Sequence, residues 1–176
     1  MGKIKKQPKV KLVAGFIFKQ EDTYKKAKSS LEKLFGEADF ESPEIAFIHT
    51  DYYEKEFGKS LKRRFLSFRK LVSPDSLPKI KLLTNRIENK LSREEKRLIN
   101  IDPGYVDMAK LVLASTKDFS HRIYLSKGIF AEITLCFRGD TFKTWEWTYP
   151  DYRTREYIEI FNKIRESYIS QIRDTL

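Results

Sequence analysis

Two residues of one short segment stand out as candidates for chemistry. Asn100 and Asp102 alternate with Ile99 and Ile101, so a strand over residues 97–102 would place the amide and the carboxylate on one face. A carboxylate in such a place can accept hydrogen bonds or take part in proton transfer. An Asp before Pro-Gly is also typical of a turn, and this structural interpretation of Asp102 stays open.

A second set of polar residues lies on a predicted β-hairpin over residues 123–137. In the expected register, Arg122 lies across from Glu132 and Tyr124 lies across from Phe130, away from the apolar side chains. A guanidinium, a phenol and a carboxylate on one face suit a phosphate or a nucleobase. The face is either a binding floor or a solvated sheet face whose Arg–Glu pair sets the register, and the sequence leaves both open.

Further candidates complete the predicted site. His121 precedes Arg122, and an imidazole with a pKa near 6.5 is suited to proton transfer. The predicted catalytic residues are therefore Asp102, Glu132 and His121. The predicted ligand-binding residues are Arg122, Tyr124, Asn100, Tyr105, Lys81, Asp51 and Tyr52.

One apparent phosphate-binding motif is rejected. Gly58-Lys59-Ser60 ends like a P-loop, but Tyr53 occupies the position where that loop needs its first glycine. No cofactor can be named from the sequence.

Metal ligands are not predicted. His49, His121 and Cys136 lack the spacing of a zinc site. A hard-cation site built from Asp51, Asp102 and Glu132 would depend on long-range geometry that a sequence does not contain.

Composition indicates a globular protein with a basic surface. The 176 residues carry a formal charge of +10, which attracts polyanions such as RNA or serves solubility alone. The aromatic-rich residues 145–152 fit base stacking or the anchoring of a helix. A single cysteine favours the cytoplasm, and the longest apolar run, residues 12–18, is too short to span a membrane.

Hydrophobic periodicity predicts the elements that must position these residues. In residues 10–18, both the odd-numbered and the even-numbered positions carry apolar residues, which is typical of a strand buried on both faces. Other strands are predicted over 44–52, 63–72 and 97–102, the last stopped by Pro103-Gly104. Helices are predicted over 22–35, from Ser73-Pro74 onward and over 153–172, while 106–116 fit a strand or a short helix.

The order of these elements predicts one α+β domain over residues 1–176. A β-α-β-β-α-β start is typical of the ferredoxin-like arrangement, here extended by the hairpin and a C-terminal helix. The hairpin is expected to turn through a three-residue loop, residues 126–128, with Ile123 and Leu125 toward the core. We expect a mixed or antiparallel sheet covered by helices.

Several stretches of the chain resemble a bacterial family catalogued as domain of unknown function 4416. The matching stretches are Thr50-Asp51-Tyr52-Tyr53, Phe65-Leu66-Ser67-Phe68, Lys81-Leu82-Leu83-Thr84-Asn85, Asn100-Ile101-Asp102-Pro103-Gly104-Tyr105, His121-Arg122-Ile123-Tyr124-Leu125 and Trp147-Thr148-Tyr149-Pro150-Asp151-Tyr152. The resemblance extends nearly end to end and implies no activity or catalytic residues.

Two functions follow from the sequence. The first is a nucleic-acid- or nucleotide-binding module that uses the basic surface and the polar sheet face, with RNA or a nucleotide as partner and no membrane. The alternative is an enzyme acting on a phosphorylated or nucleotide-like metabolite, with a carboxylate, Arg and His site. The oligomeric state is not predicted.

Overall fold

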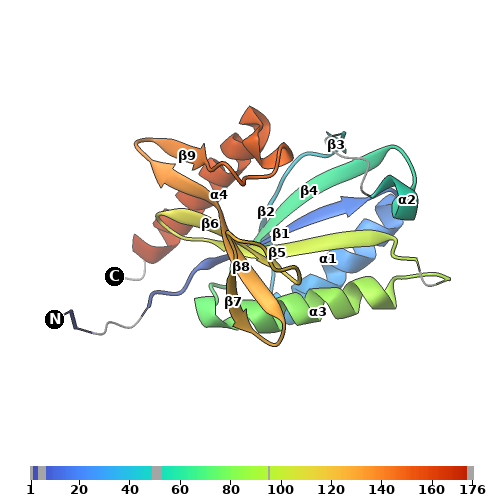
Figure 1. The fold of residues 1–176 in the computed structure, drawn as a ribbon, viewed down its shortest axis with the longest axis horizontal. Coiled ribbons are helices and arrows are strands. Elements are labelled where there is room, and N and C mark those ends of the chain that lie inside the picture. The colour runs from blue at the N-terminus through green and yellow to red at the C-terminus, as the bar shows by residue number, and fades with distance from the viewer. Residues whose placement is uncertain (1, 4–6, 49–52, 95, 174–176) are drawn as a thin grey trace.

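The computed structural model describes residues 2–3, 7–48, 53–94 and 96–173. In these residues, nine strands form one antiparallel sheet in the order β2-β4-β1-β5-β6-β8-β7, with β3 beside β4 and β9 beside β8 (Figure 1). The strands are β1 (Lys11–Phe18), β2 (Ala38–Glu41), β3 (Ile45–Phe47), β4 (Leu61–Phe68), β5 (Ile99–Val106), β6 (Lys110–Ser115), β7 (Ile123–Ser126), β8 (Ile129–Arg138) and β9 (Thr141–Thr144). The helices are α1 (Glu21–Phe35), α2 (Glu54–Phe57), α3 (Leu77–Lys90) and α4 (Arg155–Arg173), with 3₁₀ turns at Pro74–Ser76 and Asp151–Arg153. The predicted α+β class with an antiparallel sheet and covering helices is confirmed.

Strand β1 lies inside the sheet, and all eight of its residues are buried, as its sequence pattern predicted. On one face of the sheet, Phe16 packs in a core with Tyr24 of α1 and Ile80 of α3. On the other face, Val13 packs in a core with Phe161 of α4. Figure 1 shows α4 separated from α1 and α3, in agreement with these two cores. Strand β1 therefore divides two hydrophobic layers.

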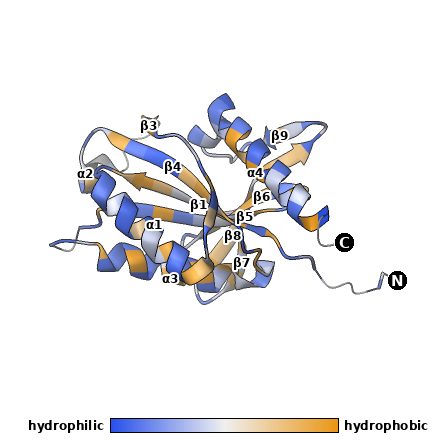
Figure 2. Ribbon diagram, turned by 180° about the vertical axis from the view of Figure 1, so that it is seen from behind, coloured by the Kyte–Doolittle hydropathy of each residue, from blue (hydrophilic) through white to orange (hydrophobic). Residues whose placement is uncertain are grey.

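Amphipathic sequence explains where the long helices lie. Tyr24, Ala27 and Leu31 form the buried stripe of α1. Figure 2 shows both hydrophobic and hydrophilic residues along this helix. Gly36 follows with a φ of 92°, a conformation that glycine adopts without strain. Helix α3 begins one 3₁₀ turn after Ser73, although the Ser73 hydroxyl caps no backbone N–H in the described chain. The helices predicted near residues 22–35 and 153–172 are confirmed as α1 and α4.

Strand β5 continues through Pro103-Gly104, so the predicted turn at this point was wrong. Pro103 pairs with Ala14 of β1, while β6 joins β5 only from Gly104 onward. Pro103, which has no N–H to donate, thus lies outside the second ladder. A Cβ on residue 104 would lie 2.3 Å from the carbonyl oxygen of Val112, so the close approach of β5 and β6 requires glycine. Residues 106–116, for which the sequence allowed a strand or a short helix, contain strand β6.

The N-terminal strands are shorter and more numerous than predicted. The strand expected over 44–52 appears as β3, and residues 49–52 lie outside the described chain. The strand expected over 63–72 ends with β4 at Phe68. Strands β2 and β9 were not predicted, because runs of four residues carry little periodicity.

The predicted hairpin is confirmed as β7 and β8, with Tyr124 opposite Phe130 as expected. The predicted three-residue loop was wrong, since Ser126 pairs with Ile129. Lys127 and Gly128 form a two-residue turn with φ values of 54° and 74°, as type I′ turns require. A bulge between Tyr124 and Ser126 offsets the shift in register that the shorter turn introduces, so the expected pairs form further along the hairpin.

The buried residues of the hairpin match the prediction only in part: Ile129 and Leu135, which were expected to face the core, are buried. Ile123 is 70% exposed and Ile133 is 38% exposed, whereas Glu132 and Thr134 are buried. The reason is a segment that precedes α4: its Tyr149 hydroxyl accepts a hydrogen bond from Arg122 at 2.5 Å. The Thr148 hydroxyl of the same segment donates to the Thr134 carbonyl oxygen at 2.7 Å. Arg122 and Glu132 therefore lie inside the protein.

Candidate functional site

The sheet opens between β5 and β6, and the side chains of α3 occupy the place of the missing neighbour. The two strands pair only from Gly104 onward. Before that point, the Lys81 ammonium donates to the Ile101 carbonyl oxygen at 3.1 Å. The Ile101 N–H donates to the Glu88 carboxylate at 2.6 Å. These two bonds satisfy the edge of β5, as a neighbouring strand would otherwise do.

Two adjoining cavities lie at this opening, with volumes of about 430 Å³ and about 330 Å³. We call the larger one the aromatic compartment and the smaller one the polar compartment. They share six lining residues: Tyr53, Asp102, Ala114, Ser115, Lys117 and Tyr149. Because so much of the wall is common, the two compartments form one site.

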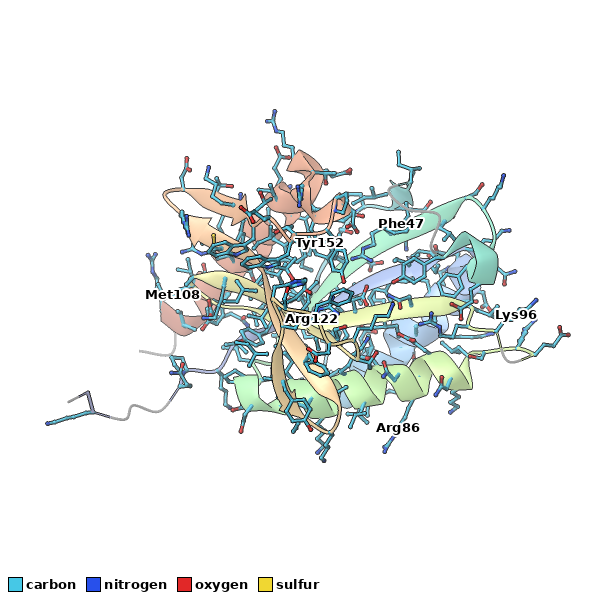
Figure 3. The ribbon with its side chains drawn as sticks, viewed as in Figure 1. Phe47, Arg86, Lys96, Met108, Arg122 and Tyr152 are labelled. Atoms are coloured by element: carbon cyan, nitrogen blue, oxygen red, sulfur yellow. The ribbon has the colours of Figure 1, made fainter. Side chains whose placement is uncertain are left out.

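The aromatic compartment is lined by rings from three distant segments. Phe47 comes from β3, Tyr53 precedes α2, and Tyr149 and Tyr152 precede α4. Figure 3 labels Phe47 and Tyr152 in the interior region around Arg122, whereas Arg86 and Met108 lie at the periphery. Burial raises the pKa of Tyr149 and that of Tyr152, so both phenols remain protonated at neutral pH. The compartment therefore combines flat apolar walls with neutral hydroxyl groups.

Arg63 is a charged group that sequence reasoning missed. Only 1% of the residue is exposed. One Nη donates to the Tyr152 hydroxyl at 2.5 Å, and the other lies 3.4 Å from the Asp102 carboxylate. Its Nε has no hydrogen-bond partner among the described residues. The alternation of buried residues along β4, with Arg63 in phase with Phe65, was the signal that could have placed it inside.

Asp102 lies at the junction of the two compartments. Its carboxylate is 27% exposed, and its oxygens lie 3.4 Å from Arg63 and 4.0 Å from the Lys81 ammonium. Both distances are longer than those of a tight charge-assisted bond, about 2.7–2.9 Å. Asp102 thus retains capacity to accept hydrogen bonds from a bound molecule.

The polar compartment brings together Lys81, Asn85, Glu88 and Asn100 beside Asp102. Only 5% of Asn100 is exposed, and its side-chain NH₂ has no partner in the described part of the chain. Burying an amide in this way is costly unless a water or a ligand accepts its hydrogen bond. This compartment offers an ammonium group and free amide donors to a ligand.

Glu88, one of two acidic residues that line the polar compartment, is buried. Burial raises the pKa of Glu88, although Lys81, the Ile101 N–H and Arg97 act in the opposite direction. Arg97 binds Glu88 at 3.1 Å and also holds Glu56 through two 2.7 Å bonds. The guanidinium of Arg97 is thus already engaged by two carboxylates.

The predicted Arg122–Glu132 pair is present, but its solvated setting was wrong. The two groups meet at 2.8 Å, and each side chain is only 2% exposed. Arg122 also donates to Ser115, to the Lys117 carbonyl oxygen and to Tyr149. With its donors so engaged, this pair forms a wall of the aromatic compartment and has little capacity left for a ligand.

The structure brings together five of the ten predicted residues. Asp102, Glu132, Arg122, Lys81 and Asn100 line the two compartments. His121 lies 3.3 Å from Glu132 and stacks on Trp147, outside both linings.

Two other predicted residues, Tyr124 and Tyr105, do not line the two compartments. Tyr124 is 58% exposed on β7, and Tyr105 packs with Val112 in a separate core. Asp51 and Tyr52 lie outside the described residues. Among the residues that the structure describes, no three His, Cys, Asp or Glu side chains converge as metal ligands.

Membrane insertion through a helix also finds no support in the described helices, since none is both long and apolar enough to cross a bilayer.

The comparisons with known proteins add a family and no chemistry. A family model described as a domain of unknown function (DUF4416) matches residues 8–168. Among curated proteins and among solved structures, none matches the chain. The matched range contains all the residues that line the two compartments. The chain therefore belongs to the family of domain of unknown function 4416.

Proposed function

We propose that this protein binds a small phosphorylated, nucleotide-like metabolite in the two compartments around Asp102. The observation that carries the proposal is the contrast between adjoining compartments, one walled by aromatic rings and one supplied with ammonium and amide donors. Both volumes fall within the range of about 300–1,000 Å³ that is usual for small-molecule sites.

The polar compartment is the proposed phosphate end. Lys81 and Lys117 supply two ammonium groups, and Asn100 supplies an NH₂ without a partner among the described residues. Hydrogen bonds from cations to phosphate are roughly twice as strong as those between neutral groups. Glu88 does not oppose this strongly, because Arg97 and Lys81 lie close to its carboxylate.

An RNA-binding surface is supported less well. Among the basic residues of β4, Lys62 pairs with Glu44 and Arg64 pairs with Glu21, while Arg63 is buried. On the polar face of the hairpin, for which a binding floor was one of two interpretations, Arg122 and Glu132 are buried and Arg122 is bonded to Tyr149. Long polyanions need an open, unpaired basic face, whereas a single nucleotide needs only a cavity.

The same geometry favours Asp102 over Glu132 and His121 as the candidate acid–base group of an enzyme that acts on this ligand class. Asp102 is partly exposed and only weakly paired. Glu132 accepts bonds from Arg122, His121 and Thr134. A group that transfers a proton must reach the substrate within hydrogen-bond distance, and Asp102 is the carboxylate shared by both compartments.

A finer description of the fold is also part of the proposal. We infer that the first half of the chain is a ferredoxin-like unit. In support, β2, β4, β1 and β5 are antiparallel neighbours in this order, and α1 and α3 share one core on one face.

The test is a binding panel of inorganic phosphate, ribose 5-phosphate, sugar monophosphates and the four common nucleoside 5′-monophosphates. Thermal shift would screen the panel and isothermal titration calorimetry would measure affinity. Lys81→Met should weaken the best binder about tenfold, the equivalent of ~1.4 kcal/mol for one charge-assisted bond. Lys79→Met is the matched control, because Lys79 is an exposed lysine on the same helix. No binding by any panel member, or equal effects of the two variants, would contradict the proposal.

A further inference from the structure

The inner end of the aromatic compartment presents a hydrogen-bond donor beside an acceptor. Arg63 carries five N–H groups, and its Nε is without a partner among the described residues. The Asp102 carboxylate lies 3.4 Å from the same guanidinium and is only weakly engaged. A fully buried arginine with unused donors is costly unless something else binds it. The arrangement can therefore bind a molecule that carries both an acceptor and a donor.

Gly15 creates the space that this arginine occupies. Gly15 lies opposite Asp102 on β5 and opposite Phe65 on β4. A Cβ added at this position would lie 3.0 Å from an Nη of Arg63 and 3.0 Å from the Phe65 ring. The guanidinium thus rests on a bare stretch of backbone, with its centre 4.7 Å from the Phe65 ring centroid. Glycine permits this flat packing of cation, backbone and ring.

The charge at this end argues against a bare phosphate as the occupant. Asp102, Glu132 and Asp151 line the aromatic compartment together with Arg63, Arg122 and Lys117, so its three carboxylates balance its three cations. A phosphate would therefore find no excess of positive charge there, whereas a neutral ring needs none. Nucleobase-type rings carry acceptors and donors side by side on one edge, and arginine and carboxylates are the side chains that bind such edges.

We propose that Arg63 and Asp102 together read the hydrogen-bonding edge of a planar, neutral heteroaromatic ring held in the aromatic compartment. This inference rests on the proposed function and assigns the orientation of the ligand within it. The ring lies at the Arg63 end, between walls that include Phe47 and Tyr152, and the phosphate lies at the Lys81 end. Arg63 and Asp102 are then specificity-determining residues, and Gly15 is a positioning residue.

The experiment compares nucleoside 5′-monophosphates with ribose 5-phosphate, which keeps the sugar and phosphate but lacks the ring. By calorimetry, the best nucleotide should bind wild type at least about tenfold more tightly, as one or two charge-assisted bonds predict. Asp102→Asn should reduce this preference to less than about threefold. Ribose 5-phosphate should bind this variant as well as wild type or better, since a negative charge has been removed. Asp140→Asn, at an exposed turn, is the control for the charge change.

Two further variants protect the test against a folding defect. Gly15→Ala should displace the guanidinium by a few tenths of an ångström and lower ring preference without changing ribose 5-phosphate affinity. Arg63→Lys keeps the charge but loses the planar donors, and Arg64→Lys is its matched control because Arg64 pairs with Glu21 and lies outside both linings. Thermal unfolding of each variant identifies those that fold.

The outcomes separate this inference from the proposed function. If ribose 5-phosphate binds wild type as tightly as every nucleotide, the ring-reading assignment is wrong while the phosphate site stands. The assignment is also wrong if Asp102→Asn and Gly15→Ala keep the full preference of wild type for the ring. If neither nucleotides nor ribose 5-phosphate bind at all, the proposed function itself has failed.

Discussion

Glu132→Gln tests whether the buried Arg122–Glu132 pair is a structural element. The two side chains are each 2% exposed and meet at 2.8 Å. The substitution leaves a guanidinium without a counter-charge in the protein interior, although the amide oxygen can still accept its hydrogen bond. Loss of one partner of a buried pair costs about 3–5 kcal/mol. We expect unfolding free energy to fall by this amount.

The measurement is urea unfolding at neutral pH, supported by thermal melts. For a chain of this length, about 2–4 °C is lost per kcal/mol, so the midpoint should fall by about 10 °C. Glu159→Gln is the matched control. It breaks an Arg155–Glu159 contact of similar length, 2.7 Å, in which the side chains are 92% and 54% exposed. Exposed pairs of this kind contribute about 0.3–0.5 kcal/mol.

A double variant separates the pair from its surroundings. Arg122→Met with Glu132→Leu replaces both charges with apolar groups, and such exchanges of buried pairs are often neutral in stability. The double variant should therefore be more stable than the sum of the single losses predicts, by about 1–3 kcal/mol of coupling. A loss below about 1 kcal/mol for Glu132→Gln, as for an exposed pair, would refute the reasoning and return Glu132 to the list of functional candidates.

Two other predictions concern the opening between β5 and β6. Gly104→Ala places a Cβ 2.3 Å from the Val112 carbonyl oxygen, so it should destabilise the protein by about 2–3 kcal/mol or more in urea unfolding. Gly2→Ala, which meets nothing within 4 Å, should have no effect, and equal results would disprove the close-approach argument. Glu88 has a raised pKa, so the folded protein keeps its proton at pH values where the unfolded chain, with a pKa near 4.5, has lost it. Wild type should therefore lose unfolding free energy relative to Glu88→Gln as the pH rises from 4.5 through the folded pKa. If the difference in unfolding free energy between the two proteins stays constant, or changes in favour of wild type, the pKa of Glu88 is not raised in the folded protein.

Local sequence patterns were sufficient for much of the fold. The sequence correctly predicted three features: the burial of β1 on both faces, the helices α1 and α4, and the pairing of Tyr124 with Phe130. Each of these depends on residues close together in the chain, where periodicity of 2 or 3.6 and turn chemistry dominate. The Arg122–Glu132 contact was predicted for the same reason, since a hairpin converts a short separation in sequence into a spatial pair.

The local rules failed where a distant segment decided the outcome. Pro103-Gly104 reads as a turn, yet β1 on one side and β6 on the other keep it extended. The sequence left open whether the polar hairpin face is solvated, yet Arg122 and Glu132 on it are buried and Tyr149 contacts Arg122. Tertiary packing supplies more free energy than a turn preference, so it overrides the local signal.

The sequence by itself determined that the chain is an α+β protein with three long helices and a hairpin, and it named Asn100, Asp102, Arg122 and Glu132 as candidates. Only the tertiary structure decided which of these groups are free to act. Arg63 meets Asp102 and Tyr152 from positions 39 and 89 residues away, and no local pattern encodes such contacts. Their approach depends on strand order and on the gap between β5 and β6, which arise when the whole sheet assembles. For this reason the sequence named only some residues of the candidate site, while the fold placed Arg63, Asp102 and Lys81 relative to one another.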